Sequence, residues 1–456
     1  CKQLERGVFM HDMTKGPILS KILYFSIFIF IGGLLQNLYL IIDSIILGHY
    51  IGESGIAVVG IANPINFIVM GFLIGAAYGF GVIMARSFGA GDFIQFRKYF
   101  FNSIILSLIL GLIFTVVLFF ANEYLLKLIN TPSELFDEAH KFLLVLYLGC
   151  ASTLIYNLFA ATLRSIGNSL TPVLFLLLSV VINGIVVFIF VAILNLGVVG
   201  SAFGTIIAQT TSALCCYFYI QYKYPNIRLT KNDAILDIKN MKELLVQGAP
   251  MGMQFSFTGI GLIIVQKYLN GFGTNYIAGY SVAIRIQNIV AYIFVALGTA
   301  ISTFTSQNIG AKKMYRISKA IRYMTITSIL TAIFSMLVIR LGGGYFISIF
   351  TAEPNAELTK AALMYFNNVT LAYIPLAILI LFRNILQGYG FPITAMMAGI
   401  VELVNRVIIV ILFTDSLGFL AICLADSVNW VITAIFLLGV YFFAIRYHKQ
   451  KFNEFY

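Results

Sequence analysis

Residues 18–47 read ILSKILYFSIFIFIGGLLQNLYLIIDSIIL, and this stretch decides the fold. It carries only two charged side chains, Lys21 and Asp43, and is otherwise almost wholly apolar. A helix that crosses a bilayer needs about 20 mostly apolar residues, so this stretch predicts a membrane-spanning helix. Its apolar residues do not alternate with polar ones, which argues against a strand of a membrane β-barrel.

The rest of the chain repeats this pattern. Of its 456 residues 60% are apolar and only 10% are charged, whereas a water-soluble surface needs roughly 25% charged residues. We therefore predict an all-α integral membrane protein with twelve transmembrane helices. The predicted spans lie near residues 18–47, 54–84, 99–121, 139–163, 170–195, 199–222, 244–269, 275–304, 320–342, 361–386, 393–414 and 418–445.

The basic residues indicate how the chain is oriented. The net charge is +11, and most of the 29 Lys and Arg residues fall in the polar gaps on one side of the predicted spans. Cytoplasmic loops carry such an excess, so we expect a multi-pass protein of the cell inner membrane with both termini cytoplasmic and no nucleic-acid partner. The expected parts are a cytoplasmic segment 1–17, an N-lobe 18–222, a cytoplasmic linker 223–242, a C-lobe 243–446 and a cytoplasmic tail 447–456.

The second half of the chain repeats the first. A shift of 221 residues places Gly310-Ala311 on Gly89-Ala90 and Leu417-Gly418 on Leu196-Gly197. Six helices in each half give both copies the same orientation, so the repeat is parallel. Transporters built this way hold substrate between their halves, which predicts two six-helix lobes that rock around a central cavity.

Asp43 is the most informative residue of the N-terminal half. An ionisable group inside the bilayer costs about 3 kcal/mol on insertion scales, so its presence there needs a reason. Gln36 and Tyr39 lie seven and four residues earlier, on the same helical face. The carboxyl group of Asp43 could load and release a proton, or hold a sodium ion with neighbouring oxygens. The alternative is an acid near the outer end of its helix that reaches the headgroups.

The C-terminal half holds a mixed set of charges. Glu402 and Arg406 are four residues apart in the eleventh helix and can form an ion pair. Asp426 lies in the twelfth helix, and Arg285 and Gln287 lie in the eighth. These side chains either neutralise one another and fix the helix packing, or line the cavity and contact substrate.

Other chemistry is not indicated. The cysteines and histidines show no metal-ligand spacing, and no Gly-Lys-Ser/Thr loop for a nucleotide is present. We expect no metal site, no cofactor and no enzymatic activity. Asn183 and Thr205 offer neutral oxygens in the fifth and sixth spans, although such residues often simply join membrane helices.

Several motifs resemble those of a known family. They are Thr14-Lys-Gly-Pro, Leu35-Gln-Asn-Leu-Tyr39, Ala85-Arg-Ser-Phe-Gly-Ala-Gly-Asp92, Gln247-Gly-Ala-Pro-Met-Gly-Met253 and Thr303-Phe-Thr-Ser-Gln-Asn-Ile-Gly-Ala311. Together the motifs resemble a bacterial multidrug and toxic compound extrusion (MATE) transporter over almost the whole chain. The resemblance implies two six-helix lobes and antiport of protons or sodium against organic compounds, often cationic drugs.

The resemblance also implies roles for particular residues. Asp43 matches the coupling aspartate of the first helix, Tyr39 matches a tyrosine beside it, and Asn183 and Thr205 match oxygen donors of the cation site. The fifth-helix aspartate that the family often carries is replaced here by Val187. A single carboxylate makes a weak sodium site, so we expect protons as the coupling ion.

We therefore predict a secondary active antiporter that exports small organic compounds or drugs. The alternatives are a flippase for lipid-linked precursors from the same superfamily, a membrane-embedded lipid enzyme and a channel. A clustered set of His, Asp or Glu would indicate the enzyme, and a polar stripe along the spans would indicate the channel. The expected partners are a small-molecule substrate and membrane lipid, and the chain is expected to be a monomer.

Overall fold

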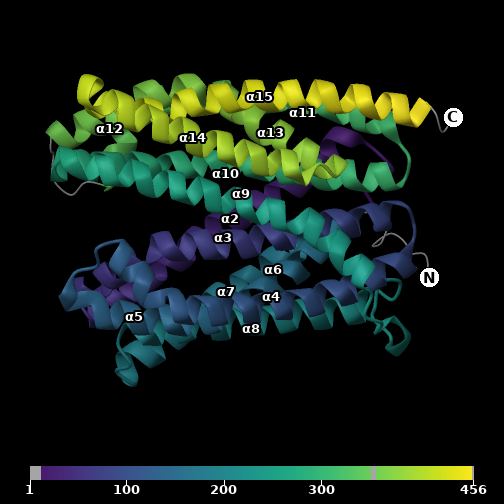
Figure 1. The fold of residues 1–456 in the computed structure, drawn as a ribbon, viewed down its shortest axis with the longest axis horizontal. Coiled ribbons are helices and arrows are strands. Elements are labelled where there is room, and N and C mark those ends of the chain that lie inside the picture. The colour runs from purple at the N-terminus through teal and green to yellow at the C-terminus, as the bar shows by residue number, and fades with distance from the viewer. Residues whose placement is uncertain (1–11, 351–355, 454–456) are drawn as a thin grey trace. The chain divides into compact units, whose positions relative to one another are not determined.

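The computed structural model describes residues 12–350 and 356–453, and this part of the chain is helical without a strand (Figure 1). The expected segments 1–17 and 447–456 lie partly outside the described residues. The long helices are α2 (Ile18–Tyr50), α3 (Glu53–Gly89), α4 (Phe93–Leu128), α5 (Ser133–Leu148), α6 (Cys150–Ser165), α7 (Leu170–Phe188), α8 (Val198–Lys223), α9 (Ile238–Leu269), α10 (Thr274–Gly310), α11 (Met314–Phe350), α12 (Ala356–Val369), α13 (Tyr373–Tyr389), α14 (Pro392–Leu417) and α15 (Phe419–Asn453).

The predicted twelve spans are confirmed. Within the described residues, eleven helical segments are long and apolar enough to cross a bilayer. The one remaining span, which is the fourth along the chain, is the pair α5 and α6, and this pair is bent by 45° around Gly149. Glycine is a poor helix former because it loses the most backbone freedom, so a break at this residue is physically reasonable.

The tenth predicted span is also interrupted. Helix α12 is followed by a turn of 3-10 helix, Thr370–Ala372, before α13 begins at Tyr373. Pro375 lies in the first turn of α13, where its missing N–H costs no intrahelical hydrogen bond. Proline in the middle of a continuous helix removes a hydrogen bond, as Pro64 of α3 and Pro250 of α9 do, whereas the interruption before Tyr373 avoids that loss for Pro375.

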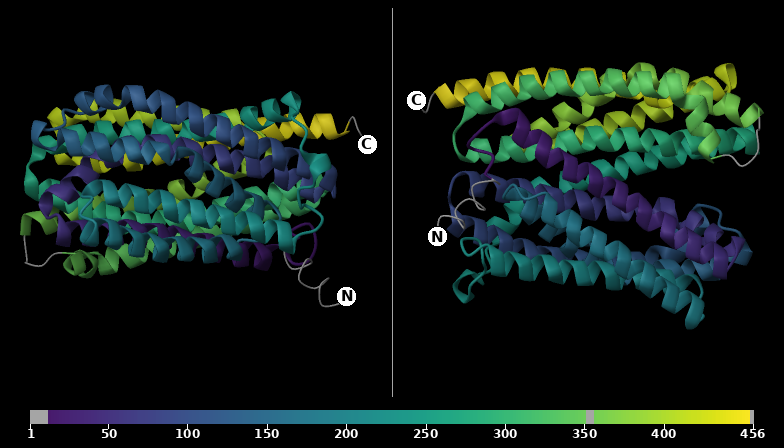
Figure 2. Two further views of the ribbon diagram at one scale, coloured as in Figure 1. Left: turned by 90° about the horizontal axis from the view of Figure 1, so that it is seen from below. Right: turned by 180° about the vertical axis from the view of Figure 1, so that it is seen from behind.

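The helices pack into two compact units. The first unit holds Tyr24–Gly252 and Ser306–Met314, together with the described residues before Ile18. In it α7 packs against α8 and α3 against α6. The helices of this unit are coloured from purple to teal in Figure 2. The second unit holds Ile18–Leu23, Met253–Thr305 and the described residues from Tyr315 onward, with α15 packed against α13 and α14. The lobe bounds 18–222 and 243–446 stay a prediction.

The connection between α8 and α9 is fixed to the first unit. It contains a short 3-10 helix, Lys231–Asp233, and Arg97 Nε of α4 lies 3.0 Å from Asp233 Oδ1. The backbone N–H of Thr230 donates to Asp233 Oδ2 at 2.9 Å. Burial alone would raise the pKa of the Asp233 carboxyl, but hydrogen bonds from Thr230 and Arg97 outweigh it and lower that pKa. The carboxylate is therefore ionised at neutral pH and holds the connection against α4.

The ends of α3 and α10 meet through a reciprocal contact within the first unit. A Cβ added to Gly89 would lie 1.9 Å from the carbonyl oxygen of Gln307, and one added to Gly310 would lie 1.9 Å from that of Arg86. The 221-residue shift relates Gly89 to Gly310 and Arg86 to Gln307. The contact is therefore self-complementary, like the interface of a twofold dimer, although both halves belong to one chain.

This contact predicts a large effect for a small substitution. Gly89→Ala should lower the free energy of unfolding by about 1–3 kcal/mol, because the new methyl group meets backbone that cannot rotate away. Thermal or denaturant unfolding of the purified protein in detergent measures the change. Gly60→Ala on the same helix is the matched control, since a Cβ there meets nothing within 4 Å. Equal stability of the two variants would contradict the close contact.

Candidate functional site

The candidate site in the first unit is built around Asp43, the only acidic residue of α2. Asp43 is buried, with 8% of its surface exposed. Ser201 of α8 donates a hydrogen bond from its hydroxyl to Asp43 Oδ2 at 3.1 Å. The other carboxylate oxygen, Oδ1, is buried and has no hydrogen-bond partner within residues 12–350 and 356–453. A buried carboxylate with an unsatisfied oxygen is costly unless a proton or a cation neutralises it.

Three further polar side chains surround this carboxylate. Asn183 of α7 is fully buried and faces both Asp43 and Tyr39, while Thr205 of α8 faces Tyr39. Neither polar atom of the Asn183 side chain, nor the Tyr39 hydroxyl, has a hydrogen-bond partner of good geometry in the described part of the chain. Native proteins rarely leave buried polar atoms unpaired, and a cluster of them indicates a site for an ion or a proton.

Gln36 does not join this cluster. Its side chain is exposed, whereas Asp43 on the same helix is buried and Tyr39 is partly buried. The structure thus brings together four of the five residues that the sequence suggested for cation coupling, namely Tyr39, Asp43, Asn183 and Thr205, and separates Gln36 from them.

The approach of α7 to α8 closes the site. A Cβ on Gly204 would lie 2.4 Å from Val187 Cγ2 and 3.4 Å from Asn183 Nδ2, so any side chain there would displace Val187. Val187 is fully buried one turn after Asn183, and a π-helical turn, Ile189–Ile193, follows directly. Such wide turns occur often at functional sites in helices. The position where the family often carries an acid therefore belongs to the same helical face as Asn183, but is apolar here.

The second unit contains a buried network of four charged side chains. Arg383 Nη1 lies 3.0 Å from Glu402 Oε1, and Arg406 Nη2 lies 3.1 Å from Asp426 Oδ1. Arg406 also lies 4.0 Å from Glu402 Oε2, so the two ion pairs are joined. Each of these side chains is at most 14% exposed. The network carries two positive and two negative charges, which sum to zero.

Neutral side chains complete the network. The Tyr365 hydroxyl of α12 donates to Asp426 Oδ2 at 2.9 Å, and the Thr258 hydroxyl of α9 donates to Glu402 Oε2 at 3.2 Å. The network therefore ties α9, α12, α13, α14 and α15 together. These hydrogen bonds reduce the cost of burying the ion pairs, although Arg406 Nη1 has no hydrogen-bond partner in the described residues.

Arg285 and Gln287 of α10 differ in their exposure to solvent. Arg285 is exposed, and no ion pair joins it to the described acids. Gln287 is 3% exposed, and neither atom of its amide has a hydrogen-bond partner in the described residues. The structure thus places Glu402, Arg406 and Asp426 together and leaves Arg285 outside that group.

Two contributors are absent from the set that the sequence suggested. Ser201 lies four residues before Thr205 on one face of α8, so helical spacing could have found it. Arg383 is a charged residue within a span. Because such residues are rare in membrane helices, its presence there could have drawn attention to it. Within the described residues no group of three or more His, Cys, Asp and Glu side chains is placed to hold a metal ion.

Twelve apolar helical spans, an internal repeat and a buried acid together define a multi-pass membrane protein of the transporter class. The model of the MatE family matches residues 29–189 and 250–412, so it matches the chain twice. The two matches begin 221 residues apart and end 223 residues apart, which confirms the parallel repeat. The chain belongs to the MatE family of membrane transporters, as its resemblance to MATE proteins implied.

Curated relatives cover most of the chain. The probable multidrug resistance protein YpnP of Bacillus subtilis is 25% identical over 76% of this chain and 77% of its own. The multidrug export protein MepA of Staphylococcus saprophyticus is 26% identical over 86% of this chain and 87% of its own.

Solved structures share the fold. A crystal structure of MATE in the bent conformation has a TM-score of 0.88 at 21% identity, over 97% of this chain and 98% of that one. A MOP superfamily transporter from Pyrococcus furiosus, described by a reverse polarity of its binding pocket, has a TM-score of 0.86 at 22% identity, over 94% and 96%.

Proposed function

We propose that this protein exports small organic compounds, drugs among them, in exchange for protons. The family is one of membrane transporters, and relatives over most of the chain are named as multidrug resistance and multidrug export proteins. The observation that carries the coupling proposal is the unsatisfied Oδ1 of Asp43 among the unpaired polar atoms of Tyr39 and Asn183. A single carboxylate can bind a proton by itself, whereas a sodium ion would also need neutral oxygen atoms as ligands.

Coupling follows from the energetics of this site. A proton on Asp43 removes an uncompensated charge from a buried position, so the ion-loaded and ion-free forms differ in their preferred conformations. An ion can shift a conformational equilibrium only by its difference in affinity between the two states. Substrate that prefers the opposite state is then exported as the ion enters. We also propose that the two lobes rock against one another during transport and that both termini lie in the cytoplasm.

The charged network bears on the substrate. Arg383 and Arg406 are each paired with an acid, so the network presents no uncompensated charge of either sign. We propose organic cations or neutral amphiphiles as substrates because the resemblance to MATE proteins implies them, and the network does not oppose them.

Transport by purified protein in liposomes tests this function. An imposed proton gradient should drive accumulation of an organic cation, a sodium gradient of equal size should drive much less, and an organic anion should not move. Transport with sodium alone would replace the proton in the proposal. Movement of a fluorescent lipid between leaflets, with no export of soluble compounds, would instead favour the flippase alternative.

A further inference from the structure

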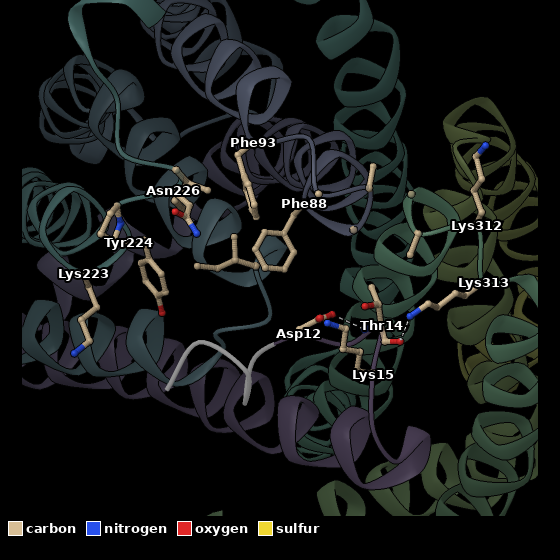
Figure 3. A pocket seen from close by; sticks show the side chains of 18 residues that line it. Asp12, Thr14, Lys15, Phe88, Phe93, Lys223, Tyr224, Asn226, Lys312 and Lys313 are labelled. Atoms are coloured by element: carbon tan, nitrogen blue, oxygen red, sulfur yellow. Dashed lines mark hydrogen bonds between the residues drawn. The ribbon is translucent and has the colours of Figure 1, made fainter. Parts of the chain in front are cut away.

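A cavity of about 680 Å³ lies in the first unit, and Asp43 is not among the residues that line it (Figure 3). Its walls are the residue stretches just before α2, after α3, after α6, after α8 and after α10. Every wall is thus a helix end or a connection. Because the connections between membrane helices lie outside the hydrocarbon core, the cavity opens on the headgroup side of the membrane and not in the core.

The cavity is strongly basic. Lys15, Lys223, Lys312 and Lys313 line it, and Asp12 is the one acidic residue among the described residues of its wall. Figure 3 shows Lys223 and Lys312 at opposite ends with their amino groups pointing away from the cavity, and Lys15 closer to the centre. Lys313 Nζ donates to the carbonyl oxygen of Thr14 at 2.9 Å, which holds the segment before α2 against the end of α10. A wall of this charge is suited to an anion.

The floor of the cavity is apolar. Phe88 and Phe93 project into it, and Ile166 and Ile227 extend the same surface. Tyr224 adds a polar group, since its hydroxyl accepts a hydrogen bond from Asn168 Nδ2 at 2.9 Å. Burial raises the pKa of Tyr224 to about 12, so its hydroxyl keeps a proton to donate. Basic rim, apolar floor and volume together suit a ligand with an anionic head and an apolar body.

The backbone at Lys312 gives an independent reason to assign a role to this wall. Lys312 has φ of 56°, and among the described non-glycine residues only two asparagines share a positive φ. The 221-residue shift relates Lys312 to Gly91, which has φ of 74° and ends α3 with the same cap. A long L-residue is strained in this conformation and glycine is not. In the second copy a strained lysine therefore occupies the position that glycine holds in the first copy. Backbone strain of this kind often marks a functional position.

We propose that this cavity binds the phosphate headgroup of an anionic phospholipid. Lys15 contacts the phosphate, the exposed side chain of Lys312 turns inward from its position in Figure 3 to reach it, and Phe88 and Phe93 contact the glycerol and first acyl carbons. Basic pockets between membrane helices on the cytoplasmic side recognise such headgroups. The cavity is lined by Gly89 and by Gly310, so a bound lipid also holds the ends of α3 and α10 together. This site is separate from the proposed transport site.

Thermal unfolding of the full chain in detergent tests the lipid site. Added dioleoylphosphatidylglycerol should raise the unfolding midpoint by several degrees, and dioleoylphosphatidylcholine should not. The double variant Lys15→Gln/Lys312→Gln should weaken the apparent affinity for phosphatidylglycerol by about fivefold for each lysine removed. The double variant Lys231→Gln/Lys239→Gln is the matched control, because it removes the same charge from exposed positions outside the cavity.

Lys312→Gly gives the sharpest result, because its two effects have opposite signs. Without lipid its midpoint should rise, since glycine relieves the strained cap, and its response to phosphatidylglycerol should fall. The proposal is overturned if phosphatidylcholine protects equally, or if the control loses as much response as the cavity variant. Equal protection by soluble glycerol phosphate would assign the cavity to a free phosphate compound and would also overturn the lipid.

Discussion

Replacing Asp43 by asparagine is expected to reduce gradient-driven export to the level of protein-free liposomes while the chain stays folded. Asparagine keeps the size of the side chain and an oxygen that accepts the hydrogen bond from Ser201. It cannot ionise, so it can neither load nor release a proton. The amide nitrogen takes the position of the unsatisfied Oδ1 and carries no charge, so we expect the unfolding midpoint of the variant to stay the same or rise.

Two measurements separate coupling from folding in this experiment. Export of an organic cation under an imposed proton gradient reports coupling, and the thermal midpoint in detergent reports folding. Ser44→Ala is the control, since Ser44 is the next residue on α2 but is exposed and bonds only within its own helix. Normal export by the asparagine variant, at a normal midpoint, would remove Asp43 from the mechanism.

Replacing Arg406 by methionine should destabilise the protein by about 3–5 kcal/mol, because it leaves a buried charge without its partner. Arg406 donates to Asp426 Oδ1 from both Nε and Nη2 at 3.1 Å, and it is 5% exposed. Methionine fills much of the same volume, so the loss reports the charge and not a cavity. The free energy of unfolding in mixed micelles measures it. Arg322→Met, at an exposed position of α11, should change stability by much less.

The double variant Arg406→Met/Asp426→Asn distinguishes the two interpretations of the charged network. With both partners neutral, no buried charge remains uncompensated at that pair, and most of the lost stability should return. If the network only fixes helix packing, export returns with stability. If Arg406 contacts substrate, stability returns while export does not. A double variant as unstable as Arg406→Met alone would contradict the pairing itself.

The sequence was sufficient for the number of spans, because long apolar runs report the bilayer directly. It could not show that the fourth span bends at Gly149 or that the tenth divides before Pro375. Those features depend on how neighbouring helices pack. Glycine and proline inside a span mark positions where a break is possible, without showing that one occurs.

The candidate site was predictable in part for a similar reason. Asp43 is evident because a charge within a span is costly, wherever its partners lie. Gln36 illustrates the limit of helical spacing: it lies only about 20° from Asp43 around the helix axis and yet is exposed, because burial also depends on how far the neighbouring helices extend along α2. Ser201 and Arg383 gain their roles from contacts between helices, and the rotation of each helix about its axis decides those contacts.

The reciprocal contact of Gly89 and Gly310 has a consequence for how such a chain can change over time. Each copy of the duplication supplies a glycine to the other copy and receives one in return. A bulkier residue in either copy cannot be repaired by changes in that copy alone, since the obstructing carbonyl belongs to its counterpart. Where the halves do not contact each other in this way they can differ in sequence, as Lys312 differs from Gly91. At this contact, a substitution in one half is tolerated only if the other half also changes.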